Sequence, residues 1–439
     1  MATQLERIAA KARYEPNLQF TSLFHHVTAN RVWGCLTNIP KRSAAGIDGI
    51  DVEGAKETFE EWIQPMLQSV HNKGYKAPPV RRVWIPKPGK SEKRPLGVPC
   101  IADKALQRSV SDVLSTIYEQ DFLSCSFGGR PSLGAHQALA TLNQIIFLKK
   151  VSWTYEADLK NFFGSLNHEW LLQFVKHRVG DKRILNLIKR WLKAGVMEGN
   201  VLQKSEAGTV QGGSISVLLS NIYLHYALDL WFEKVVKPRL KGEAYMVRYI
   251  DDFVVCFQYR SDAERFQEVL VKRLGKFSLT LEPSKTRLVK FGRFAQQDAK
   301  RENKKAETIY FLGFTHYCTC NPKGIFKIGR KTEKSKFRRS VKNLRELMQD
   351  IRHYKVKEQA KAINQVLRGH YGYYGLGGNY RSLMAFYRTA ERCWFKMLKR
   401  RSRKSKMTWE RFTNLRKFCP LQPPKIEVPY ARFARMAVL

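Results

Sequence analysis

Two adjacent aspartates stand in the middle of a strongly apolar segment, AYMVRYIDDFVVCF, at residues 244–257. The runs on both sides are rich in β-branched and aromatic residues, which favour strands, so the segment predicts a β-hairpin with Asp251 and Asp252 at its tip. Aspartate is also common in tight turns for purely structural reasons. The pair by itself is therefore compatible with a catalytic role and with a structural one.

A second carboxylate lies in a similar setting within VSWTYEADLKNFFGSL, residues 151–166. Asp158 follows an aromatic and β-branched run that predicts a strand, and it precedes a polar turn. Hard divalent cations need several oxygen ligands, and two such cations can hold the attacking and leaving oxygens of a phosphate transfer. Three acids at two strand ends match that need, so Asp158, Asp251 and Asp252 are candidate metal ligands.

Glycines precede a strongly apolar, helix-like run in GTVQGGSISVLLSNIYLH, residues 208–225. Glycines at the entrance of a helix let the backbone approach a base pair or a phosphate closely, and the free N–H groups there favour anions. Glycines before a helix are also ordinary loop residues. This feature alone is therefore a weak indication of a binding site.

The charge of the chain indicates a polyanionic partner. Its 439 residues include 78 Lys and Arg against 38 Asp and Glu, which gives a formal charge of +40 and makes nucleic acid the leading partner. Hydrophobic residues make up 44% of the sequence, which is typical of a packed globule rather than a coating protein. Residues 321–439 are the most basic part, with 31 Lys and Arg and 7 Asp and Glu.

This basic part also has helical periodicity. Apolar residues recur at helical spacing in three successive segments, which predicts a small helical bundle. A glycine-rich break, GHYGYYGLGGNY at residues 369–380, is predicted to separate two of the helices. The apolar residues are Val341, Leu344, Met348 and Ile351, then Ile363 and Leu367, then Leu383, Phe386, Ala390, Trp394 and Met397.

The remainder of the chain predicts an α+β fold, because strand-like and helix-like segments alternate irregularly. Prolines and basic residues crowd residues 78–95, which predicts an extended, basic hairpin or loop. No uninterrupted apolar run of membrane-spanning length occurs, and the start of the chain lacks a signal-peptide core, so a cytoplasmic protein without membrane contact is expected. The eight cysteines form no C-x-x-C pair, so structural zinc is not expected.

Beyond these local features, the chain resembles the reverse transcriptases that are encoded by bacterial group II introns, and their free-standing relatives. Blocks similar to that family occur in the family's order over nearly the whole chain. The blocks are AAGIDG at 44–49, IPKPGKSEKRPLGVP at 85–99, FGGRPSLGAHQAL at 127–139, EADLKNFFGSLNHEWLL at 156–172, GTVQGGSISVLLSNIYL at 208–224, YIDD at 249–252, LEPSKTRLV at 281–289 and FLGFTHY at 311–317.

The resemblance implies the fold of a right-hand polymerase, with fingers, a palm built on an antiparallel sheet, and a C-terminal helical thumb. It implies an N-terminal extension over residues 1–43, fingers and palm over 44–320, and a thumb or maturase-like domain over 321–439. Two Mg²⁺ or Mn²⁺ ions would be bound by Asp158, Asp251 and Asp252 of the palm.

The resemblance also implies roles for other residues. Lys285 matches a lysine proposed as the general acid for departure of pyrophosphate. The implied contacts are Lys87 and Arg94 with the incoming triphosphate, Gln211 and Gly212 with the new base pair, Phe163 with the sugar, and Tyr249 and Ile250 with the primer end. For Lys285, and for each residue that makes one of these contacts, an ordinary structural role is the alternative. Phe162 is an alternative to Phe163 as the residue that excludes ribonucleotides.

The function implied is RNA-directed DNA polymerase activity on an RNA or DNA template and primer with deoxynucleoside triphosphates. The resemblance places this activity in the nucleoid region of a bacterial cell, and a homodimer is a candidate assembly. Intron-encoded members generally have Ala where Ile250 stands, and the chain ends at Leu439 without a Cys- and His-rich endonuclease tail. Both features are typical of free-standing, group II intron-like members that serve the host, including in double-strand break repair by annealing and extending short homologies. A group II intron maturase and a plain nucleic-acid binding protein are the alternatives.

Overall fold

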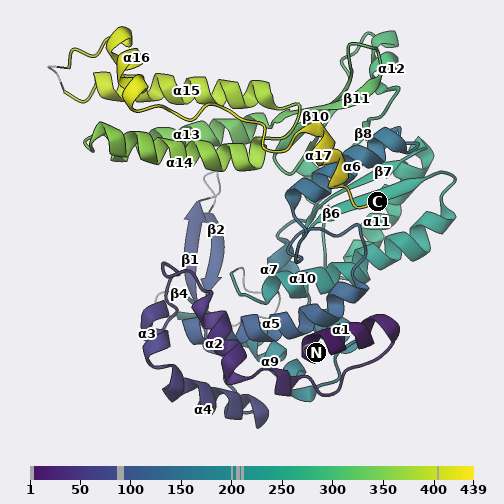
Figure 1. The fold of residues 1–439 in the computed structure, drawn as a ribbon. Coiled ribbons are helices and arrows are strands. Elements are labelled where there is room, and N and C mark those ends of the chain that lie inside the picture. Colours follow the sequence, from purple (N-terminus) through teal and green to yellow (C-terminus); the bar gives the residue numbers. More distant parts are fainter. Residues whose placement is uncertain (1–3, 87–92, 199–200, 204–207, 209–211, 403–404) are drawn as a thin grey trace.

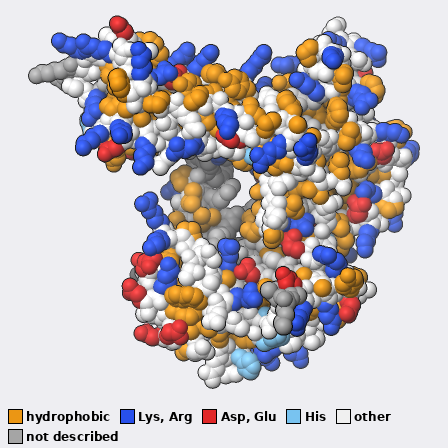
Figure 2. All heavy atoms as spheres, viewed as in Figure 1, with side chains coloured by type: hydrophobic (Ala, Val, Ile, Leu, Met, Phe, Trp, Pro, Cys, Tyr) orange, Lys and Arg blue, Asp and Glu red, His pale blue; other side chains and the backbone are white. Residues whose placement is uncertain are grey.

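The fold is a mixed α+β arrangement of small sheets and helices, which agrees with the α+β class predicted from the sequence. The computed structural model describes residues 4–86, 93–198, 201–203, 208, 212–402 and 405–439. Figure 1 shows the C-terminal helices at the top, helices from the N-terminal part of the chain at the bottom, and β6, β7 and α11 on the right. The face shown in Figure 2 is hollowed below the C-terminal helices.

The sheet that carries the predicted aspartates, named the aspartate sheet here, has the strand order β6-β7-β3-β8 and is antiparallel throughout. The hairpin predicted at residues 244–257 is confirmed as β6 and β7, and the strand predicted before Asp158 is confirmed as β3. Alternate residues of β7 point to opposite faces, so both faces are covered by apolar cores. The strands are β3 (Trp153–Asp158), β6 (Ala244–Tyr249), β7 (Asp252–Phe257) and β8 (Arg287–Lys290).

One face of the aspartate sheet packs on a large core formed by helices. Phe253, Val255 and Phe257 of β7 enter this core, and so does Tyr155 of β3. The helix predicted after Gly212 and Gly213 is confirmed as α10, which is buried among these elements. The helices that contribute are α5 (Ile101–Asp121), α8 (His168–Lys176), α9 (Lys182–Lys193), α10 (Ser216–Leu224) and α11 (Arg260–Lys276).

The N-terminal residues pack into the same core. Arg178 donates hydrogen bonds to the carbonyl oxygens of Ala12 at 2.8 Å and Glu15 at 2.8 Å, and Asp181 accepts from the N–H of Leu23 at 2.8 Å. These bonds attach the first helix to the turn between α8 and α9. The domain boundary expected after residue 43 stays a prediction. The N-terminal helices are α1 (Gln4–Tyr14), α2 (Ala29–Thr37), α3 (Val52–Glu57) and α4 (Phe59–His71).

The proline-rich, basic segment forms the extended hairpin predicted for it. β1 and β2 are antiparallel, and β4 extends the sheet by pairing in parallel with β1, giving the order β2-β1-β4-β5. In Figure 1 this hairpin stands to the left of the aspartate sheet and points toward the C-terminal helices. Its strands are β1 (Val80–Pro86), β2 (Lys93–Val98), β4 (Val196–Glu198) and β5 (Val201–Gln203).

A third sheet, with the order β11-β10-β9, covers the other face of the aspartate sheet together with α6. The last helix of the chain returns to this region and packs on α6. The boundary expected at residue 320 falls at the end of β10, inside this sheet, and it stays a prediction. The elements are β9 (Thr308–Phe311), β10 (Phe314–Cys320), β11 (Phe326–Thr332), α6 (Ala135–Leu148), α12 (Ala295–Arg301) and α17 (Tyr430–Arg435).

The predicted C-terminal bundle is confirmed, and its apolar residues form a core of their own. The glycine-rich break was predicted too long, because α14 runs through Gly369 and Gly372 and ends at Tyr374. Burial of His370 and Tyr371 in the bundle outweighs the low helix propensity of glycine. The helices are α13 (Lys334–Asp350), α14 (Val356–Tyr374), α15 (Tyr380–Lys399) and α16 (Trp409–Phe418).

Two further observations concern membrane-crossing helices and the cysteines. Within the described ranges, no helix combines the length and the apolar character that a membrane crossing requires. All eight cysteines are free thiols.

Candidate active site

The two aspartates that lie far apart in the sequence are direct neighbours in the aspartate sheet. Asp158 is the last residue of β3 and Asp252 is the first residue of β7, and the two are register partners across the antiparallel pair. Their side chains point to the same face, because directly opposed residues of an antiparallel pair share a face. The structure thus brings together the carboxylates that the sequence placed at two strand ends.

The turn between β6 and β7 consists of two residues, because Tyr249 pairs with Asp252. Ile250 occupies the left-handed region with a φ of +58°. A β-branched residue rarely adopts this conformation, and such outliers cluster at functional sites. Asp251 follows Ile250 directly, so the strained turn sets the position of the third predicted acid.

The carboxylates crowd negative charge into a poorly solvated place. Burial raises the pKa of Asp252 to about 8, and the charges of Asp158 and Asp251 add to the effect. The ammonium group of Lys285 lies 2.6 Å from Oδ2 of Asp158. Burial opposes the charge of Lys285, but the hydrogen bond and charge of Asp158 raise the pKa of this lysine overall. The site therefore favours cations.

Lys285 is held in place through the backbone of its own segment. Leu281 forms a bridge with Leu159, and the N–H of Glu282 donates to the carbonyl oxygen of Asp158 at 2.8 Å. Lys285 then ends the short 3-10 turn Pro283–Lys285. This places a proton-carrying ammonium group beside the predicted metal ligands.

The chemistry of the donor set fits a hard divalent cation, because carboxylate oxygens are the ligands that Mg²⁺ and Mn²⁺ prefer. Burial is the main cause of the raised pKa of Asp252, and the neighbouring charges of Asp158 and Asp251 raise it further, while Lys285 lowers it. Across the described part of the chain, no three His, Cys, Asp or Glu side chains are already gathered around one point as metal ligands. One carboxylate of the set, Asp158, is turned to Lys285 instead.

A buried polar network lies directly beneath the turn. Arg248 of β6 uses all of its guanidinium N–H groups within the protein, and both Arg248 and Asp229 are fully buried. One of these bonds, to the carbonyl oxygen of Ile250 at 3.0 Å, reaches the strained turn itself. The other acceptors are Asp229 Oδ1 at 2.8 Å and Oδ2 at 2.5 Å, Asn221 Oδ1 at 3.1 Å and Ser126 Oγ at 2.7 Å.

The loop of Gly128 and Gly129 packs against the same turn. A Cβ on Gly128 would lie 2.6 Å from Cγ1 of Ile250, and a Cβ on Gly129 would overlap the side chain of Val217. Asn221 donates to the carbonyl oxygen of Gly128 at 2.8 Å, which ties this loop to the network. Only glycine leaves room for the loop to come this close.

The sequence did not predict this network. Asn221 and Asp229 were visible as polar interruptions of the most apolar stretch of the chain, and Arg248 as a charge inside a strand. A charged residue within an apolar strand needs a partner, so that pattern is the signal that identifies such a network. Asp229 also lies in the π-helical turn His225–Asp229 (η2), a local form that is frequent at functional sites.

Two adjacent phenylalanines were candidates for contact with the nucleotide sugar. Phe162 is buried in the large core with 2% of its surface exposed, whereas Phe163 is only partly buried. Both belong to the short helix Phe162–Ser165 (α7), which begins four residues after Asp158. The exposure of Phe163 leaves it, and not Phe162, able to contact a bound substrate.

The remaining predicted residues are described in part. Gly212 has a φ of +116°, and a Cβ there would lie 2.6 Å from the carbonyl oxygen of Gly97. The backbone at Gly212 therefore lies directly against β2. Arg94 belongs to β2 and pairs with Ile85, but its side chain lies outside the described part. Lys87 and Gln211 also lie outside the described residues.

Comparison with known proteins gives one family. Residues 85–316 match the family described as "Reverse transcriptase (RNA-dependent DNA polymerase)". The group II intron-encoded protein LtrA of Lactococcus lactis subsp. cremoris is 34% identical over 222 residues, which are 50% of this chain and 37% of that protein. Protein YkfC of Escherichia coli (strain K12) is 30% identical over 226 residues, 50% of this chain and 59% of that protein.

The match to the family begins at the end of β1, contains β2 to β9 and all three aspartates, and ends within β10. Carboxylates on adjacent strands of a mixed α+β fold are compatible with a two-metal site, and the family match gives the class: an RNA-dependent DNA polymerase. The chain belongs to the reverse transcriptase family, and it is similar to a member that a group II intron encodes. It spans less than two thirds of the length of the relatives named above.

Proposed function

We propose that this protein is an RNA-directed DNA polymerase with a right-hand arrangement. The β1–β2 hairpin and the N-terminal helices would be the fingers, the aspartate sheet the palm, and α13–α16 the thumb. The observation that carries the proposal is the direct pairing of Asp158 with Asp252 beside the turn that holds Asp251. This pairing concentrates carboxylate oxygens at one edge of a sheet, as nucleotidyl transfer requires.

Asp158, Asp251 and Asp252 would hold two Mg²⁺ or Mn²⁺ ions, which supply activation of the primer 3′-hydroxyl and neutralisation of the triphosphate. The chain's own residues then do the positioning. Lys285 carries a proton beside Asp158 and would donate it to the departing pyrophosphate. The Arg248 network fixes the turn through the carbonyl oxygen of Ile250.

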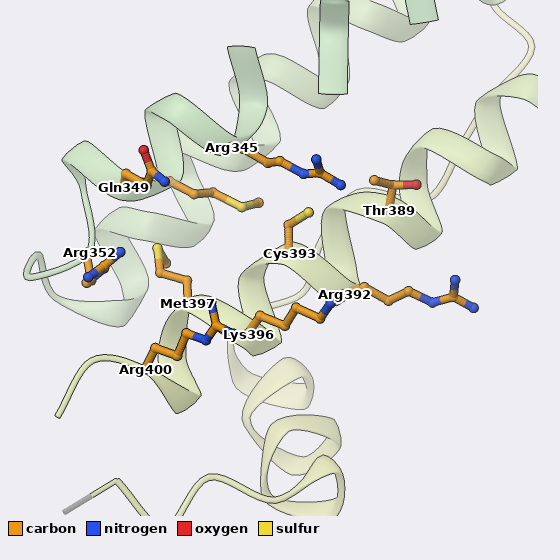
Figure 3. Close-up of a pocket in the computed structure, with 10 residues that line it drawn as sticks. Arg345, Gln349, Arg352, Thr389, Arg392, Cys393, Lys396, Met397 and Arg400 are labelled. Carbon is orange, nitrogen blue, oxygen red and sulfur yellow. The ribbon is translucent and has the colours of Figure 1, made fainter. Parts of the chain in front are cut away.

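The C-terminal bundle supports binding of the template and primer by their phosphates. Arg345 of α13 and Arg352, just after it, face Arg392 and Lys396 of α15 and Arg400 at its C-terminal end. They line a groove of about 560 Å³, named the bundle groove here (Figure 3). None of its described lining residues is acidic, and none of these cations forms an ion pair with another described residue. Such a groove suits a nucleic-acid backbone, which carries one negative charge per phosphate.

Primer extension on matched RNA and DNA templates tests the polymerase assignment. The native protein with Mg²⁺ or Mn²⁺ should extend the primer, and Asp252→Asn should lower incorporation by at least about 1000-fold, because a metal ligand is lost. Asp350→Asn, on the exposed end of α13, is the control and should retain activity. Incorporation by Asp252→Asn at the native rate would refute the assignment.

We further propose that the enzyme copies DNA as well as RNA and serves double-strand break repair by annealing and extending short homologies. Ile250, which puts a larger side chain than alanine beside the turn, supports an altered priming mode. Two DNA ends with short, partly complementary 3′ overhangs are the test substrate. Failure to extend them, with normal activity on a primed RNA template, would exclude the repair role alone.

The alternative is a group II intron maturase, an RNA-binding splicing cofactor. One relative carries such a name: the nuclear intron maturase 3, mitochondrial, of Arabidopsis thaliana is 25% identical over 182 residues. A maturase needs the basic surfaces and not the aspartates. Full cellular function of an Asp251→Ala variant would therefore favour the maturase.

A further inference from the structure

The β11-β10-β9 sheet has one buried face and one open face. Ile309, Phe311, Phe314, Cys318 and Ile328 point into the apolar core that this sheet shares with α6. The residues that alternate with them point outward, as the period of two in a strand requires. An open face on a small sheet of this kind is available for binding.

Cross-strand pairing places the outward residues in two rows. One row consists of Lys331, Thr315 and Tyr310, and the next contains Tyr317 between Gly329 and Thr308. A Cβ on Gly329 would overlap the ring of Tyr317, so the ring of Tyr317 lies over the backbone of Gly329. The missing side chain of Gly329 thus lets this tyrosine lie down across the sheet.

Tyr310 offers a second ring on the same face. Its side chain is 47% exposed, and the guanidinium of Arg287 stands 4.9 Å from the ring centre. Its backbone N–H is bound to the buried carboxylate of Glu156, which fixes the strand. Two tyrosines on a firmly held sheet form a stacking surface for bases, because every base has an aromatic face.

Basic side chains surround this surface. The groove over the sheet has a volume of about 1420 Å³ and is walled by α12 on one side and by the first turns of α13 and α15 on the other. Lys331, Lys334, Arg338 and Arg381 line it, and none of them forms an ion pair with a residue that the structure describes. Glu307 and Glu333 are the acidic residues of the described lining, so the net charge of the groove is strongly positive.

We propose that this groove is a second nucleic-acid site, which binds a single-stranded segment of RNA or DNA by stacking bases on Tyr310 and Tyr317 and by pairing phosphates with the surrounding cations. A duplex does not fit this chemistry, because its bases are already stacked and hide their faces. The groove lies over the outer face of the third sheet and is lined by none of the three aspartates. The proposal therefore does not depend on polymerase activity.

Binding of fluorescent 12-nucleotide oligo-U and oligo-dT to the full chain tests the proposal. An excess of blunt primer–template duplex occupies the polymerase site, and no nucleotide is added. Tyr310→Ala combined with Tyr317→Ala should weaken binding of the single strand by about 10-fold or more, and both Tyr→Phe changes together should restore it, since the stacking face remains. The RNA and DNA probes show which single strand is preferred.

Tyr259→Ala is the matched control, because Tyr259 is 46% exposed and lies outside the groove. It should leave binding unchanged. Photo-crosslinking of a bromouridine-substituted oligonucleotide should mark peptides that contain Tyr310 or Tyr317.

Equal affinity of the native and double-alanine proteins, with crosslinks only elsewhere, would overturn the proposal. A polyglutamate peptide that displaces the oligonucleotide equally well from the native and double-alanine proteins would also overturn it and indicate an acidic protein partner.

Discussion

Arg248 combines stability with positioning, because its guanidinium neutralises buried Asp229 and also holds the carbonyl oxygen of Ile250. Replacing one member of a buried ion pair leaves the other charge unpaired, which costs about 3–5 kcal/mol. We expect Asp229→Asn to lower the free energy of unfolding by this amount in urea titrations. Glu233→Gln breaks the half-exposed pair with Lys237 and should cost about 1 kcal/mol or less.

Replacing both Arg248 and Asp229 separates the role of Arg248 in positioning the turn from its role in stability. Arg248→Met with Asp229→Leu should regain much of the lost stability, because apolar residues of similar volume often substitute for a buried pair. The turn would then lack its hydrogen bond to Ile250, and we expect kcat for nucleotide incorporation to fall by up to about 100-fold with little change in KM. Native kcat in this double variant would show that the network is structural only.

Phe163 is expected to exclude ribonucleotides by contact with the sugar. Phe163→Val should increase incorporation of ribonucleotides relative to deoxynucleotides by at least about 10-fold, measured as the ratio of kcat/KM values. Phe162→Val is the paired control: it removes buried volume and should cost about 1–3 kcal/mol of stability without changing the ratio. Relaxed discrimination in Phe162→Val alone would reverse the assignment.

The role of a residue was predictable from the sequence where its neighbours in the chain indicate that role. Asp158 and Asp252 both stand at strand ends, so the sequence indicated their kind of site before their pairing was known. The contacts of Arg248 were not predictable, since Ser126 is far along the chain from the helical stretch that holds Asn221 and Asp229. The sequence shows that a charge inside an apolar strand needs a partner, but only tertiary packing decides which side chains meet it.

At the scale of elements, period and composition gave the correct type of structure. The 244–257 hairpin, the 78–95 hairpin and the three bundle helices were all predictable, because each combines a clear period with boundary residues. The end of α14 was not. Its glycines suggested a break from residue 369, but buried His370 and Tyr371 carry the helix on to Tyr374.

His370 of α14 predicts acid sensitivity of the bundle. Burial lowers the pKa of His370 to about 4, whereas an unfolded histidine titrates near about 6.5. Between these values the unfolded chain binds a proton that the folded chain excludes, so this group's contribution to stability is lost as the pH falls below about 6.5. The rings of His370 and Phe386 are stacked, with their centroids 3.9 Å apart. His370→Phe keeps a ring in this place and removes the titrating group.

The stability of His370→Phe relative to the native protein should therefore rise by about 2 kcal/mol between pH 7.5 and pH 5. Urea titrations of both proteins at each pH measure this difference. A difference that stays constant over the range would contradict the prediction.

At the scale of the whole molecule, positive charge is spread widely over the face shown in Figure 2, as the blue side chains there show. The net charge of +40 therefore indicated the class of partner but not the path of the nucleic acid. Two basic grooves differ in their other residues. The described lining of the bundle groove has no aromatic residue, which suits a backbone, while the groove over β9–β11 adds tyrosines, which suit unpaired bases.

The bundle groove predicts a change in the salt dependence of duplex binding. Each phosphate contact contributes about 0.9 to the slope of log affinity against log salt concentration, so Arg345→Gln with Arg392→Gln should reduce the slope by about 1–2. Binding of a primer–template duplex, followed by anisotropy over a salt series, measures the slope. Lys189→Gln with Arg190→Gln removes equal charge from exposed positions of α9 and should leave the slope nearly unchanged. Equal slopes in both variants would mean that the duplex follows another surface, because general attraction by the net charge would then explain all of the salt effect.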